Sequence, residues 1–272
     1  MSENAEKPFR LVQITDCHLG GDPGEELLGL NTEESFLDVL KLVQAHEHDI
    51  DYIVTSGDIA SMGAEPAYHR FLKFVKNYLP YPLAWLPGNH DLATLMRSLE
   101  AAYASSETPV QGGFVDTDRW RIILLDSSVP GSEFGAIADS EITRLKTLLD
   151  QTDKHVLVFV HHQPIPVGCK WVDQYIIKNH SELFAALKTN ERVKGIVFGH
   201  VHQEFNGEKD GLPIIATPST CIQFSPNSDD FKVDTAMPGY RWFNLHNDGR
   251  FETDVVRLPH KDYGIDYESG GY

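Results

Sequence analysis

Five short apolar segments of this chain end at a residue that can bind a metal ion, and this regularity constrains the fold most strongly. Each segment reads as a buried strand because apolar residues dominate it and it is too short for a typical helix. The expected strands, each with the polar residue that follows it, are 9–15 with Asp16, 52–56 with Asp58, 83–86 with Asn89, 155–160 with His161, and 195–198 with His200. Amphipathic stretches that predict helices lie between them, at 31–46, 64–78, 140–150 and 181–188.

The alternation of strands with helices is typical of βαβ units and predicts largely parallel pairing. After residue 200 the pattern becomes β-rich, and the Asn247-Asp248-Gly249 sequence predicts a hairpin turn. We therefore predict an α/β fold in which two packed mixed β-sheets are flanked by helices. We expect 1–272 to form a single domain with a polar tail, 258–272, on the surface.

Composition and charge restrict the functional class. The chain has 272 residues and a net charge of −17, which repels long nucleic-acid polymers. No apolar run approaches the ~18 residues of a membrane span, and the polar start lacks the apolar core of a secretory signal. Three distant cysteines, Cys17, Cys169 and Cys221, argue against a disulfide framework, so we expect a cytoplasmic protein.

The polar residues that follow the strands form the series D-x-H, G-D, G-N-H-D, H and G-H-x-H. In an extended backbone residues i and i+2 point the same way, so Asp16 and His18 are expected to face one ion while Cys17 points away. His200 and His202 have the same spacing. The glycines before Asp58, Asn89 and His200 suit turns in which the backbone passes close to the site.

The ligand types indicate the class of metal. Imidazole together with carboxylate suits manganese, iron, zinc or nickel, and no thiolate is needed. Two carboxylates, one amide and four imidazoles are more donors than one tetrahedral zinc ion uses, so two ions are expected. A pair of metals ~3.5–4 Å apart clamps the attacking and leaving oxygens of a phosphoryl displacement.

This series resembles the signature of the calcineurin-like metallophosphoesterase superfamily. The flanking segments VQITDCHL, LLGLNTEESF, AWLPGNHD, HHQPIPVGCKWVDQ and ATPSTCIQF extend the resemblance to class III cyclic-nucleotide phosphodiesterases, and most closely to the bacterial 3′,5′-cyclic AMP phosphodiesterases. The resemblance covers nearly the whole chain. It implies hydrolysis of 3′,5′-cyclic AMP to 5′-AMP by two divalent or trivalent transition metal ions (iron, manganese or zinc), with a metal-bridging hydroxide as nucleophile.

The resemblance also implies a role for each residue. Asp16, His18 and His202 hold one metal, whereas Asn89, His161 and His200 hold the other. Asp58 bridges the two ions and forms the catalytic pair with His90, which contacts the phosphate and protonates the leaving oxygen. The residues expected at the substrate are His18, Asp58, Asn89, His90 and His202.

Several alternatives stay open at this point. The substrate is a small cyclic nucleotide or another phosphodiester, such as a glycerophosphodiester or a nucleotide-linked lipid, and a non-catalytic scaffold or a homodimer is compatible with the same fold. Asp91 is expected to cap a helix or to orient a histidine. His162 is expected to point away from His161 and to lie behind the ligands. Trp171 and Phe224 are either structural anchors or a platform for a purine ring.

Overall fold

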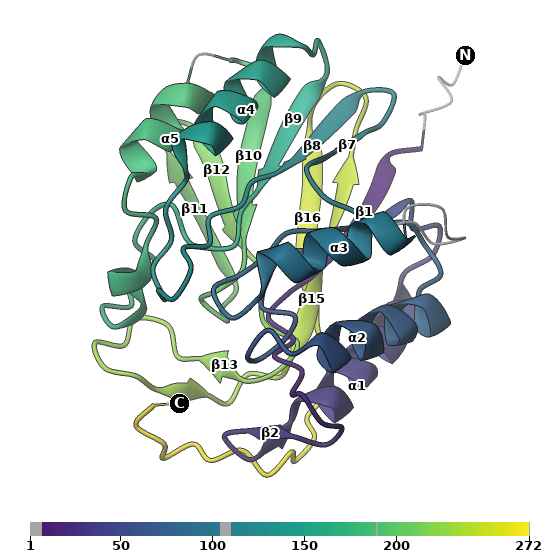
Figure 1. Cartoon of the computed structure of the whole chain (residues 1–272), viewed down its shortest axis with the longest axis vertical. Coiled ribbons are helices and arrows are strands. Elements are labelled where there is room, and N and C mark those ends of the chain that lie inside the picture. Colours follow the sequence, from purple (N-terminus) through teal and green to yellow (C-terminus); the bar gives the residue numbers. More distant parts are fainter. Residues whose placement is uncertain (1–6, 104–109, 189, 272) are drawn as a thin grey trace.

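The computed structural model describes residues 7–103, 110–188 and 190–271. Within these residues two six-stranded sheets pack face to face and helices cover their outer faces (Figure 1). This arrangement confirms the predicted fold class. No described helix combines the length and the apolar character that crossing a membrane requires.

The first sheet is built around the N-terminal strand. Its strands in spatial order are β16 (Phe251–Arg257), β15 (Gly239–Leu245), β1 (Phe9–Ile14), β4 (Tyr52–Thr55), β5 (Leu83–Trp85) and β6 (Val110–Gln111). β1, β4, β5 and β6 are parallel, whereas β15 pairs antiparallel with β1 and forms the predicted hairpin with β16.

The second sheet repeats this parallel centre. Its strands in spatial order are β11 (Phe205–Lys209), β12 (Leu212–Ala216), β10 (Val193–Phe198), β9 (His155–Phe159), β8 (Trp120–Leu124) and β7 (Phe114–Asp116). The four inner strands are parallel and the two edge strands are antiparallel. The carboxyl ends of parallel strands share one edge of a sheet, which is where ligand sites form in α/β folds.

Five α-helices are present in the described residues, and they form the outer layers. They are α1 (Thr32–His46), α2 (Glu65–Tyr78) and α3 (Ala93–Tyr103) on the first sheet, and α4 (Asp139–Asp150) and α5 (His180–Leu187) on the second. α1 begins as predicted, because the Asn31 side chain accepts a hydrogen bond from the Glu34 amide at 3.0 Å. α3 was not predicted, and only Met96 and Leu99 of this helix are buried.

The remaining elements are short. They are the strand pair β2 (Glu26–Leu27) and β3 (Leu30–Asn31), the pair β13 (Gln223–Phe224) and β14 (Val233–Asp234), and the 3₁₀-helix η1 (Val172–Tyr175).

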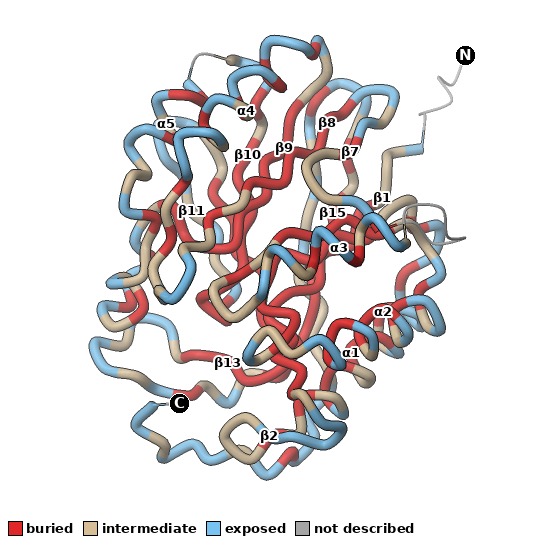
Figure 2. The backbone as a smooth tube through the Cα atoms, viewed as in Figure 1, coloured by how far each residue is buried: buried red, intermediate tan, exposed pale blue. Residues whose placement is uncertain are grey.

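Buried residues gather in the strands of both sheets, whereas the helices also carry exposed stretches (Figure 2). Side chains alternate between the two faces of each strand, and this alternation divides the core into layers. In β1, Val12 and Ile14 pack against the helices of the first sheet, whereas Leu11 faces the second sheet. Phe243 of β15 also points into the layer between the sheets, where its ring meets Phe159 of β9. The apolar layer between the sheets holds their carboxyl ends together, because exposing it to water would cost ~25 cal/mol per Å².

The prediction of a surface tail from residue 258 onward is wrong in part. Tyr263 is only 9% exposed, and its hydroxyl donates a 2.9 Å hydrogen bond to Asp38 of α1. The Lys261 ammonium contacts Glu34 and Asp38, at 2.7 and 2.6 Å. The tail is polar in composition, but one buried aromatic ring and two salt bridges of Lys261 fasten it to α1.

Candidate metal centre

The seven predicted ligands come from strand ends of both sheets and meet in one cluster. They are Asp16, His18, Asp58, Asn89, His161, His200 and His202, and groups drawn from the Asp and His members lie close enough together to hold metal ions. His90 lies beside them, with its ring 4.8 Å from that of His18.

The first half of the cluster surrounds His202. Its Nε2 atom lies 3.1 Å from Nε2 of His18 and 3.5 Å from Oδ1 of Asp16. These three side chains are buried. Two imidazole nitrogens and a carboxylate oxygen thus converge on one small volume.

The second half surrounds His161. Its Nε2 atom lies 3.1 Å from Oδ1 of Asn89, and its ring centroid is 5.1 Å from that of His200. Among the described residues, Nε2 of His200 is buried and has no hydrogen-bond partner. A buried imidazole nitrogen without a partner is costly, and a metal ion would satisfy it.

Asp58 lies between the two halves. Its Oδ2 atom is 3.1 Å from Nε2 of His161 and 3.7 Å from Nε2 of His18. Its Oδ1 atom accepts a 2.9 Å hydrogen bond from the His90 amide. One carboxylate oxygen therefore faces both histidine groups while the other fixes the backbone of the His90 loop.

Hydrogen bonds behind the histidines orient them for metal binding. Nδ1 of His161 lies 2.8 Å from the Ser56 carbonyl, and Nδ1 of His202 lies 2.8 Å from the Ile222 carbonyl. A carbonyl oxygen only accepts hydrogen bonds, so each Nδ1 carries the proton. Each Nε2 therefore points into the cluster with a lone pair that can bind a metal ion. The residues present therefore fit transition metal ions.

The electrostatics of the metal-free cluster are dominated by burial and by the carboxylates. Burial lowers the pKa of His161, but the Asp58 charge and hydrogen bond outweigh it and raise that pKa to about 9. Burial likewise lowers the pKa of His202, but Asp16 and Cys221 together outweigh it and raise that pKa to about 10. His18 and His200 have pKa values well below the usual range, because burial disfavours their charged forms.

The backbone at the ligands differs from the predicted extended geometry. Asp16 and His18 have φ values of 54° and 46°, and His200 and His202 have 64° and 49°. These residues are left-handed, a conformation that costs non-glycine residues free energy and that concentrates at functional sites. The side chains of each pair converge because the chain coils sharply at the strand end, and the i, i+2 alternation of a strand does not apply.

The predicted close approach of glycine backbone is confirmed. A Cβ atom at Gly88 would lie 2.1 Å from Oδ1 of Asp58, and one at Gly57 would lie 2.4 Å from Nδ1 of His161. Either contact would displace a side chain of the cluster, so only glycine fits at these two positions.

Asp91 has a role that the sequence analysis missed. Its carboxylate accepts hydrogen bonds from the amides of Ile59, Ala60 and Gly88 at 3.0–3.2 Å, and from the Tyr68 hydroxyl at 2.9 Å. It therefore fastens the Asp58 loop to the Gly88–His90 loop, and both predicted roles, as a helix cap and as a histidine partner, are wrong. Burial beside Asp58 raises the pKa of Asp91.

His162 lies behind the predicted ligands, as expected, and packs on the His200 ring. Its ring centroid is 4.6 Å from that of His200, and its Nδ1 is 2.8 Å from the Ser127 hydroxyl. The contact with Ser127 joins the end of β9 to the loop after β8. Alternation along an extended strand does not continue past Phe159, where β9 ends.

A cavity of about 320 Å³ opens beside the cluster. Its lining combines Asn89, His90 and His200 with an aromatic wall that includes Trp171, Tyr175 and Phe231, and residues Gly270 and Gly271 of the tail. Phe224 also lines this cavity, and it is buried and stacks on the His202 ring at 4.3 Å, which is the contact of a structural anchor. Its alternative role as a platform for a purine stays a prediction. Trp171 is only partly buried and packs edge-on against Phe231.

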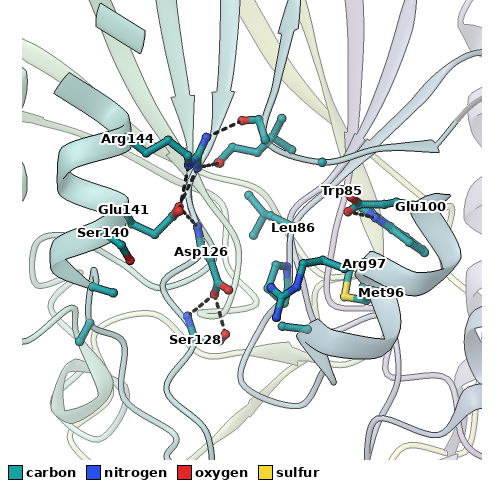
Figure 3. Close-up of a pocket in the computed structure, with 17 residues that line it drawn as sticks. Trp85, Leu86, Met96, Arg97, Glu100, Asp126, Ser128, Ser140, Glu141 and Arg144 are labelled. Carbon is teal, nitrogen blue, oxygen red and sulfur yellow. Dashed lines mark hydrogen bonds and ion pairs between the residues drawn. The ribbon is translucent and has the colours of Figure 1, made fainter. Parts of the chain in front are cut away.

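A second cavity, of about 350 Å³, lies between α3 and α4 (Figure 3). Arg144 of α4 is held there by Glu141 and by the Leu124 carbonyl, and Glu100 of α3 accepts a 2.7 Å hydrogen bond from the Trp85 indole. The predicted ligands and His90 are not among the residues that line this cavity, so the metal centre lies elsewhere.

Comparison with known proteins agrees with this site. The sequence profile of the calcineurin-like phosphoesterases matches residues 9–204. The chain belongs to the calcineurin-like phosphoesterase family. It is 39% identical over 268 residues to the 3′,5′-cyclic adenosine monophosphate phosphodiesterase CpdA of Escherichia coli K12, covering 98% of this chain and 96% of that protein.

Two further similarities extend the comparison. The CpdA phosphodiesterase of Pseudomonas aeruginosa is 37% identical over 263 residues, which cover 96% of this chain and 94% of that protein. A dimetal phosphatase from Danio rerio has the same fold, with a TM-score of 0.61, 16% identity, and coverage of 93% of this chain and 99% of that one. The two-sheet fold of this chain is therefore the fold expected for its family.

The raised pKa values of His161 and His202 lead to a prediction about pH. Below about pH 9 both rings hold an extra proton in the metal-free protein, and a metal ion must displace it. Manganese affinity should therefore rise as the pH increases from about 6 to about 9, with proton release at neutral pH. Titration calorimetry in buffers of different ionisation enthalpy measures the manganese affinity and the number of protons released. A manganese affinity that is constant from about pH 6 to about pH 9 would contradict the prediction.

Proposed function

We propose that this phosphoesterase hydrolyses 3′,5′-cyclic AMP to 5′-AMP with a two-metal centre. The observation that carries the two-metal part is the position of Asp58, whose Oδ2 atom faces a histidine of each half of the cluster at 3.1 and 3.7 Å. The proposal for the substrate is supported by the CpdA relatives, whose names specify cyclic AMP and which align over nearly the whole chain. We further propose that residues 1–272 form one catalytic domain.

The assignment of ligands follows the two halves of the cluster. Asp16, His18 and His202 would hold one ion, and Asn89, His161 and His200 the other, with Asp58 shared between them. Manganese, iron and zinc all suit this set of imidazole and carboxylate donors. When bound, the two ions would neutralise the phosphate and supply a hydroxide between them as the nucleophile.

His90 is placed to act on the leaving group. Its Nδ1 atom donates to the Ser61 carbonyl at 2.9 Å, and this bond fixes the plane of the ring. Its amide is held by Asp58, and it lines the cavity, so the ring can reach a bound phosphate. A protonated His90 would donate a proton to the ribose 3′ oxygen as the phosphorus–oxygen bond breaks.

The cavity is suited to the nucleoside part of cyclic AMP. Trp171 and Tyr175 line the cavity with partly buried rings, and the Tyr175 ring centroid is 6.3 Å from that of His200. Aromatic walls stabilise a planar base by stacking. The three buried, unpaired cysteines support the further proposal that the protein works in the reducing cytoplasm.

Replacement of His90 tests the proposed acid. His90→Ala should reduce kcat for cyclic AMP by about 10²–10⁴-fold, because a poor alkoxide leaving group needs a proton. Turnover of a nitrophenyl phosphodiester should fall much less, because nitrophenolate leaves without protonation. kcat for both substrates should be measured at verified metal content, with His69→Ala as the control for an exposed histidine. Equal losses for both substrates would show that His90 only binds phosphate.

Replacement of Trp171 tests the nucleoside subsite. Trp171→Ala should raise KM for cyclic AMP by about tenfold, since one base–aromatic stack contributes ~1–3 kcal/mol. KM for the nitrophenyl phosphodiester, which carries no base, should change less. Steady-state kinetics of both substrates give the ratio, and Trp242→Ala provides an aromatic control outside the cavity. A parallel rise in both KM values would place the base elsewhere.

A further inference from the structure

A buried group of polar side chains lies in the layer between the sheets, directly beneath the metal centre. It consists of Gln13 of β1, Thr15 and Ser56 at the ends of β1 and β4, Thr217 after β12, and Arg241 of β15, all almost fully buried. The rest of this layer is dominated by apolar residues such as Leu11, Val197 and Phe243. Polar groups in such a place are retained only when they are hydrogen-bonded, so the group needs an explanation.

Alternation along the strands places these side chains on the inner faces of both sheets. Gln13 is two residues after Leu11, and Ser56 is two residues after Val54, both of which face the layer between the sheets. Arg241 is the register partner of Gln13 across the β1–β15 pair. The polar group therefore sits at the edge of the apolar layer nearest the ligands.

Gln13 connects strand ends of both sheets. Its Nε2 donates to the Ser56 hydroxyl at 2.7 Å and, at 3.4 Å, to the Phe198 carbonyl at the end of β10. Its Oε1 accepts a hydrogen bond from the Thr217 hydroxyl. Ser56 in turn donates to Thr15 at 2.7 Å. One amide thus joins β1 and β4 of the first sheet to β10 and β12 of the second.

The strand ends joined by Gln13 are the ones that carry ligands. Asp58 follows Ser56 by two residues, His200 follows Phe198 by two, and Asp16 follows Thr15 directly. Arg241 adds a second link in the same direction, because its guanidinium donates to the Ala216 carbonyl of β12 at 3.0 Å. A shift of one sheet against the other would break these bonds and move the ligands that follow the strand ends.

We propose that Gln13 is a positioning residue that fixes the distance between the ligands of the first sheet, Asp16 and Asp58, and those that follow β10 of the second. This inference rests on the proposed two-metal function. Gln13 does not reach the ligands itself. It acts through Ser56, Phe198 and Thr217. The amide nitrogen donates to Ser56 of the first sheet and to Phe198 of the second, and the amide oxygen accepts from Thr217 of the second sheet.

The test compares metal binding in variants of the full chain. Gln13→Leu keeps the approximate volume and removes the amide, and it should weaken binding of manganese by about 10–100-fold, the usual effect of losing a residue that orients metal ligands. The electron paramagnetic resonance signal of the coupled manganese pair should also change, because it depends on the distance between the ions. Tyr240→Phe is the matched control, since it removes a buried 2.7 Å hydrogen bond to Glu47 from the helix-facing side of β15.

A second pair of variants covers the case in which Gln13→Leu does not fold. Thr217→Val removes the hydroxyl that donates to Gln13, and Thr217→Ser retains it. We expect Thr217→Val to bind manganese more weakly and to change the electron paramagnetic resonance signal. We expect Thr217→Ser to recover both the affinity and the signal. A loss of stability alone would lower the melting temperature of both Thr217→Val and Tyr240→Phe without changing the signal.

The outcomes separate the inference from the function on which it rests. If the wild-type protein binds two manganese ions with a coupled signal, and Thr217→Val and any folded Gln13→Leu keep the wild-type affinity and signal, the positioning role is wrong and the proposed function stands. If the wild-type protein binds fewer than two ions, the two-metal function is wrong and the inference falls with it.

Discussion

The fold of this protein is organised around a carboxylate that is buried at the point where the two sheets meet. Asp58 is only 2% exposed, and a buried charge is very unfavourable unless it is paired and hydrogen-bonded. Burial raises its pKa, but the neighbouring His161 outweighs this and holds the pKa well below its usual range. Several features of the site compensate this charge: the His90 amide, the histidines on either side, and the metal ions that we propose.

The compensation requires residues that are distant in the chain to meet within a few ångströms. Parallel strands in both sheets achieve this, because their carboxyl ends carry the ligands to one edge. The loops after these strands are then fastened to one another by Asp91, whose carboxylate accepts bonds from three amides of two loops. The polar group around Gln13 joins the strand ends below. The site is thus supported on one side by loop contacts and on the other by contacts between sheets.

Much of this arrangement could be predicted from the sequence, since strand and helix periodicity and ligand spacing are local patterns. The helices α1 and α2, the central strands and the convergence of the seven ligand positions followed from such patterns. The roles of Asp91 and Gln13 could not be predicted, because their partners lie far away in the sequence and no local signal marks a side chain that bonds distant amides or carbonyls. The left-handed backbone at Asp16 and His200 was also missed, because its conformational strain is compensated by tertiary contacts that a sequence pattern does not contain.

The central claim is that Asp58 bridges two metal ions, and diffraction from manganese-soaked crystals at the manganese absorption edge tests it most directly. The account predicts two anomalous peaks per chain, ~3.5–4 Å apart, with the Asp58 carboxylate bonded to both. One peak would lie among Asp16, His18 and His202, and the other among Asn89, His161 and His200. A single peak, or two peaks of which only one contacts Asp58, would contradict the account.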